Sequence, residues 1–101
     1  MLVYSICMNT ITDAKLQKYF HVTKAAYSMA KESGNRHAKL KAEREDFLDM
    51  IQRYIKDAEH FEKKGDIVDA FAALNYAHGW LDAGARLGLF DVHNSKLFTV
   101  D

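Results

Sequence analysis

The sequence predicts an all-α fold: an antiparallel three-helix bundle followed by an irregular apolar tail. Three stretches carry apolar residues at spacings of three and four, the repeat that lines one face of a helix. The chain of 101 residues contains no proline, which turn-rich β folds generally use at edges and turns. The links between the three stretches are short, and short links favour antiparallel neighbours.

The first helix is predicted over residues 13–33. Thr12 is a favourable N-cap, and Asp13 places a negative charge in the first turn. We expect Gly34-Asn35 to end the helix in a left-handed conformation. The apolar face of this helix comprises Leu16, Tyr19, Phe20, Thr23, Ala26, Tyr27 and Ala30.

The second helix is predicted over residues 38–64. A heptad-like apolar seam runs along it, and acidic and basic residues occupy most other positions, as expected of a solvated face. Gly65 closes this helix, and Asp66 opens the next, with Asp69 in the spacing of a capping box. The seam comprises Leu40, Phe47, Ile51, Tyr54, Ala58 and Phe61, flanked by Leu48 and Ile55.

The third helix, predicted over residues 67–87, is apolar or small nearly all round, which indicates that more than one of its sides is covered. Two interior glycines, Gly79 and Gly84, need a reason, because each costs a helix about 0.8–1 kcal/mol relative to alanine. Gly84 lies near the inner face, where it would admit a neighbouring helix. The expected core of the bundle contains Phe20, Tyr27, Phe47, Ile51, Ile55, Phe61, Phe71, Leu74 and Leu81.

Length and composition indicate a single domain over 1–101, with a core at 11–92 and terminal extensions at 1–10 and 93–101. Lys plus Arg and Asp plus Glu both number 14, so bulk charge gives no argument for nucleic acid or a lipid surface. The single cysteine, Cys7, excludes an internal disulfide and fits a reducing compartment. Without an apolar run of about 20 residues, we expect a cytoplasmic protein with no membrane association.

The tail over 89–101 is too apolar to float free. Either it folds back over the bundle, or its 96–100 stretch forms a short strand, for which 2–7 is a candidate partner.

From Asp57 onward, the sequence DAEHFEKKGDIVDAFAALNYAHGWLDAGARLGLFDV closely resembles an archaeal family, the Domain of Unknown Function 357 family. The pattern over 11–30 is similar to the family as well, so the resemblance covers most of 11–92. It implies an archaeal source and a three-helix bundle similar to a spectrin repeat, and it implies no activity. The residues that carry it include Phe61, Gly65-Asp66, Ala70-Phe71, Asn75-Tyr76, His78-Gly79-Trp80-Leu81-Asp82, Gly84 and Arg86-Leu87.

A candidate polar cluster on the third helix comprises Asn75, His78, Asp82 and Arg86, at spacings of three and four that let the side chains meet. Asp82 could orient His78 as a base, and Arg86 could hold an anion. No candidate nucleophile lies beside the group, so we favour a structural role and expect Asp82 or Arg86 variants to change stability or association.

Three other patterns suggest chemistry but are weak. Arg86 and His93 have the six-residue separation of a bundle ribonuclease motif, although Gly88 is expected to break the helix between them. Asp57/His60 and Asn75/His78 show the spacing of bundle di-metal sites, yet the inner seams of the first two helices lack carboxylates. A basic tip around the first hairpin could contact phosphates but lacks interleaved aromatics. The tip comprises Lys31, Arg36, His37, Lys39, Lys41 and Arg44.

The outer face of the third helix is the candidate interface: Ala72, Tyr76, Gly79 and Ala83. A merely solvated face would carry Lys and Glu, so we expect this strip to be covered by a second copy in a homodimer, or otherwise by another protein or the tail. Trp80 is expected in the core or at an interface. The sequence therefore predicts a non-catalytic interaction or self-association module without catalytic residues, cofactor or metal; the alternative is an RNA-binding or ribonuclease-like bundle.

Overall fold

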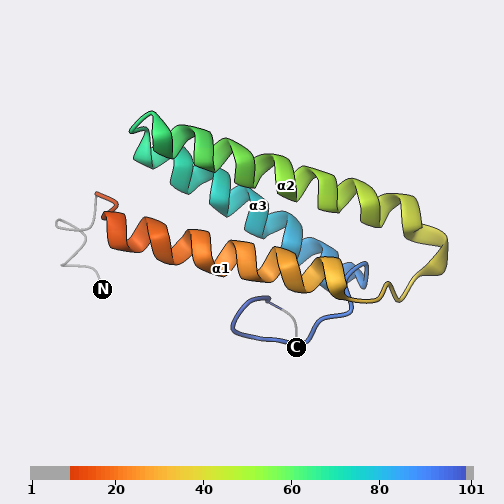
Figure 1. Ribbon diagram of the computed structural model, residues 1–101. Coiled ribbons are helices and arrows are strands. Elements are labelled where there is room, and N and C mark those ends of the chain that lie inside the picture. The colour runs from red at the N-terminus through yellow and green to blue at the C-terminus, as the bar shows by residue number, and fades with distance from the viewer. Residues whose placement is uncertain (1–9, 100–101) are drawn as a thin grey trace.

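The computed structural model describes residues 10–99 and contains three long helices (Figure 1). Helix α1 spans Asp13–Glu32, a short 3-10 turn η2 spans Ala38–Leu40, α2 spans Lys41–Lys63 and α3 spans Ile67–Leu87. Consecutive helices run in opposite directions, so α1 and α3 point the same way (Figure 1). The predicted all-α antiparallel bundle and the predicted helix positions are confirmed.

The helix ends follow local chemistry, with two departures from expectation. The Thr12 hydroxyl accepts a hydrogen bond from Lys15 N at 3.1 Å and caps α1. At the other end of α1 the prediction was wrong, because Ser33 in an extended conformation ends the helix and Gly34 is not left-handed. Asp66 occupies the N-cap position of α3, but its side chain makes no capping hydrogen bond. The capping box is therefore not formed.

Two glycines end helices in the left-handed conformation. Gly65 has a φ of 81°, which lets Asp66 N reach Phe61 O after α2, and Gly88 has a φ of 85°, which lets Leu89 N reach Gly84 O after α3. Such six-to-one hydrogen bonds satisfy carbonyl groups that a helix end leaves without partners. The chain can therefore turn back sharply at both points.

The core is formed where the apolar faces of the helices meet, with α3 packed against both α1 and α2. Phe20, Ile51, Ile55, Leu74 and Leu81 are buried as predicted. The other predicted core residues are aromatic and pack at the edges of the core in a partly buried state: Tyr27, Phe47, Phe61 and Phe71.

The tail folds back over the bundle and adds to its core. Leu89 and Phe90 are fully buried, and Val92 and Phe98 are nearly so. The stretch after Asn94 forms a turn in which the N–H groups of Leu97 and Phe98 bond to Asn94 O, so the predicted short strand is absent as far as residue 99. The proposed strand partner at 2–7 lies outside the described residues.

Within residues 10–99, the structure contains no helix that is both long and apolar enough to cross a membrane.

Candidate functional site

Three members of the predicted polar cluster hold the C-terminal tail. His78 Nε2 lies 2.6 Å from the carbonyl oxygen of Leu97. A carbonyl can only accept, so Nε2 carries a proton and donates, while the Nδ1 of a neutral ring accepts from the Thr23 hydroxyl at 3.3 Å. Both ring nitrogens are thus engaged by the fold.

The next turns of α3 bind the backbone of a single tail residue. Asp82 Oδ1 accepts a hydrogen bond from Thr99 N at 2.9 Å, and Arg86 Nη1 donates to Thr99 O at 3.2 Å. The adjacent Phe98 side chain is buried with 2% of its surface exposed. The polar flank of α3 therefore recognises main-chain groups of the tail, and Phe98 anchors the segment in the core.

Asn75, the fourth member of the predicted cluster, takes no part in these contacts with the tail. Its side chain is exposed and forms no hydrogen bond with the described residues 10–99. Asp82 Oδ1 lies 3.9 Å from His78 Nε2, too far for the hydrogen bond that would orient the ring as a base. The structure thus places Asp82 closer to the tail than to the imidazole.

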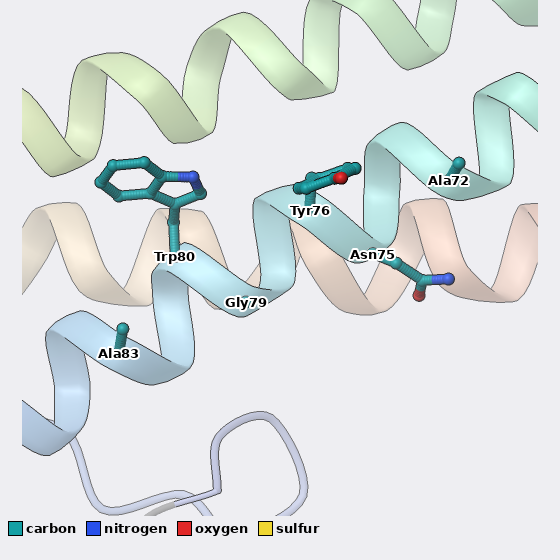
Figure 2. A pocket seen from close by; sticks show the side chains of 6 residues that line it. All are labelled: Ala72, Asn75, Tyr76, Gly79, Trp80 and Ala83. Atoms are coloured by element: carbon teal, nitrogen blue, oxygen red, sulfur yellow. The ribbon is translucent and has the colours of Figure 1, made fainter.

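The candidate interface strip is open to solvent on the outer side of α3. Tyr76 stacks on Tyr54 of α2 with ring centroids 5.4 Å apart, and Trp80 meets Phe47 edge-to-face at 4.8 Å. These contacts tilt both rings toward α2 and leave a shallow hollow beside Gly79 (Figure 2). The hollow has a volume of about 610 Å³ and is lined by Ala72, Asn75, Tyr76, Gly79, Trp80 and Ala83.

The open strip is longer than the sequence indicated. Val68 and Leu87 are 68% and 52% exposed, and at 100° per residue both project on the same side of α3 as Tyr76, which is 63% exposed. Three of the large apolar side chains left in solvent therefore belong to one helix face. The tail does not cover this face as far as Thr99, because it lies along the flank formed by His78 and Asp82.

A family model described as "Protein of unknown function (DUF357)" matches residues 18–90. The chain belongs to the DUF357 family. Comparisons with curated proteins and with solved structures gave no significant match. The matched region of this DUF357 protein ends at Phe90, so the tail segment held by the polar cluster lies beyond it.

Gly84 serves packing within the chain. A Cβ atom at this position would overlap the ring of Phe90, which passes directly over the helix after the turn at Gly88. The close neighbour of Gly84 is therefore the segment after α3, and the expectation of a neighbouring helix at this point was wrong. Gly79 differs, because a Cβ atom there would meet no atom of the described residues within 4 Å.

Arg44 has a structural role that sequence reasoning missed when it placed this residue in the basic tip. Its guanidinium donates to Leu89 O at 2.6 Å and to Ser33 O at 2.8 Å, and it also lies 5.5 Å from the centre of the Phe90 ring. Further carbonyl groups at the end of α1, those of Ala30 and Lys31, accept from it at 3.2 Å. Arg44 thus caps α1 and ties it to the segment that follows α3.

The predicted basic tip is altered by this arrangement. Arg44 points into the bundle, while Arg36 lies 3.9 Å from the Asp91 carboxylate. His37 and the lysines of the tip remain exposed. In the sequence, only the position of Arg44 hints at this inward orientation. It lies one turn into α2, opposite the end of α1, whose last carbonyl groups need hydrogen-bond donors.

The two weaker motifs are separated by the fold. Helix α3 ends at Leu87, so His93 lies in the tail, where its ring contacts Asp91 at 3.1 Å, while Arg86 binds Thr99. His60 is exposed on α2. Over the described part of the chain, no group of three or more His, Cys, Asp or Glu side chains gathers around one point.

Proposed function

We propose that this DUF357 protein is a non-catalytic interaction module that forms a homodimer through the outer strip of α3. The observation that carries the proposal is Gly79. It lies in the middle of α3, where glycine costs about 0.8–1 kcal/mol, and packing within residues 10–99 does not require it. A close approach by another molecule would explain the residue, as Phe90 explains Gly84.

The chemistry of the strip favours an uncharged apolar occupant. The hollow around Gly79 is lined by alanine, glycine, aromatic rings and one amide, and Val68 and Leu87 extend the apolar surface toward the two ends of α3. A charged helix face placed here would lose its hydration over the hollow, where no lining side chain carries a charge. Burial of the exposed apolar area would instead contribute about 25 cal/mol per Å².

A second copy of the chain provides such a face. The exposed positions of α1 and α2 are rich in Lys, Arg, Asp and Glu, whereas the α3 strip carries none of these in its hollow. A two-fold axis near Gly79 would therefore place the strip against itself, matching small residues with aromatic ones. The interface would be self-complementary and would need no other protein.

The test is to replace Gly79 with glutamate. The free space around Gly79 accommodates the side chain in the monomer, so the helical circular-dichroism signal should be kept while sedimentation equilibrium shows dimer converted to monomer. Ala42→Glu is the matched control, because it adds the same side chain at an exposed position of α2 and should leave the dimer intact.

Two results would contradict the proposal. Wild-type protein that stays monomeric at millimolar concentration would exclude self-association. A Gly79→Glu variant that dimerises as tightly as wild type would move the interface to another face.

A further inference from the structure

A second hollow lies between α1, α3 and the tail; Asn75 and Gly79 line it as well as the first hollow, while Tyr76 and Trp80 do not. Its volume is about 470 Å³, within the range of small-molecule sites. Helix α1 contributes Lys18 and Tyr19 to its walls, α3 contributes Asp82, and the tail contributes Lys96. Three separate parts of the chain therefore build one concave surface.

The charge in this hollow is unbalanced. Lys18 and Lys96 form no ion pair with any residue in 10–99, unlike Lys24, which pairs with Glu59 at 2.8 Å. Asp82 is the one carboxylate among the lining residues, and its Oδ1 already accepts from Thr99 N. Two lysines thus line the hollow against a single carboxylate that is already hydrogen-bonded.

The free hydrogen-bonding groups are mainly donors. His78 lines the hollow, but both of its ring nitrogens are engaged. The Asn75 amide also lines it, has no partner among the described residues, and extends away from Tyr76 and Trp80 (Figure 2). Two ammonium groups and an amide with free N–H groups are suited to a ligand that offers several acceptor oxygens.

We infer that this hollow binds a small anion, with a phosphate or carboxylate group seated between Lys18 and Lys96 and accepting a hydrogen bond from Asn75. The bound anion gives both lysines a counter-charge, which neither has among residues 10–99. Because Lys96 belongs to the tail and Lys18 to α1, the anion also links the tail to α1, next to the hydrogen bonds that α3 makes to it. Binding therefore slows exchange of the Thr99 amide.

The experiment is a titration followed by ¹⁵N–¹H spectra, with inorganic phosphate in one arm and acetate in the other, at constant ionic strength set with chloride. We expect saturable shifts confined to the amides around Lys18, Asn75 and Lys96, and the tighter probe identifies the preferred anionic group. Lys18→Gln and Lys96→Gln should each weaken binding about fivefold. Lys41→Gln, at an exposed position that starts α2, should leave the affinity unchanged.

Stability measurements separate a binding role from a structural one. In anion-free buffer the two glutamine variants should be as stable as wild type, since neither lysine side chain makes an ion pair or hydrogen bond with residues 10–99 that its replacement would break. Loss of stability in both variants would show that the lysines support the fold instead. Shifts that grow without saturation for both probes, or that spread over lysines throughout the protein, would also overturn the inference.

Discussion

Arg44 should be the most sensitive charged position in this protein. Replacing it with methionine keeps an unbranched side chain but removes every donor to the carbonyl groups of Leu89 and Ser33 and of the last turn of α1. A hydrogen bond from a charged group is worth about 1.5–3 kcal/mol, and the acceptors left behind are partly buried. The bonds share one guanidinium and are not additive, so we expect a loss of about 2–4 kcal/mol in the free energy of unfolding.

Urea unfolding followed by circular dichroism at 222 nm measures this loss, with an unchanged slope showing that the comparison is valid. Arg53→Met is the matched control, because Arg53 is 71% exposed and makes only an i,i+4 pair with Asp49; it should change stability by less than about 0.5 kcal/mol. Arg44→Lys should lie between the two, since lysine keeps the charge but not the planar fork. Equal stabilities of the Arg44 and Arg53 methionine variants would refute the assigned role.

Two further predictions concern the tail and pH. Asp82→Ala removes the acceptor of Thr99 N and should speed hydrogen exchange of the Thr99 amide at least several-fold. Exchange of the α2 core amides should stay unchanged. Equal exchange of the Thr99 amide in the variant and in wild type would exclude a role of Asp82 in holding the tail. Burial, and then the charge of Asp49, raises the pKa of Tyr27 above its ordinary value of 10.0. The folded state therefore holds this proton more tightly, so its contribution to stability is full below pH 10 and is lost as the pH rises through the raised pKa. Tyr27→Phe should flatten that alkaline decline in urea midpoints, and an unchanged decline would exclude Tyr27 as its source.

The helices could be read from the sequence because their signals are local. Apolar spacing on each face, a capping threonine at position 12 and glycine at 65 act within one or two turns, and the structure has helices where these signals place them. The position at which α1 ends was predicted correctly, but the left-handed conformation expected at Gly34-Asn35 was wrong: the C-cap is Ser33 in an extended conformation, and its carbonyl accepts from Arg44. Arg44 lies 11 residues after Ser33, and no local pattern in the sequence links it to the end of α1.

The polar cluster was found by spacing, but its contacts could not be. Helical periodicity places His78, Asp82 and Arg86 on one flank and says nothing about what lies opposite. The tail lies opposite this flank and binds it through the backbone groups of Leu97 and Thr99. Every residue has such backbone groups, so the sequence does not show which of them will be bound. The same limit applies to Lys18 and Lys96, which lie far apart in the chain and meet at one hollow only after the tail has folded back.

The two glycines of α3 show how far sequence can lead toward function. Glycine is unfavourable in a helix interior, so the sequence indicates that another group approaches the helix closely at both positions. It does not determine which group that is. The structure supplies the neighbour for Gly84, the ring of Phe90, and as far as it describes the chain it leaves open space at Gly79. Of the two, Gly79 has no such neighbour among residues 10–99, although glycine costs the helix about 0.8–1 kcal/mol there, and it lies at the centre of a face where Val68, Tyr76 and Leu87 remain in solvent. The unexplained glycine and the exposed apolar side chains have one cause if that face is an interface, and two unrelated causes if it is not.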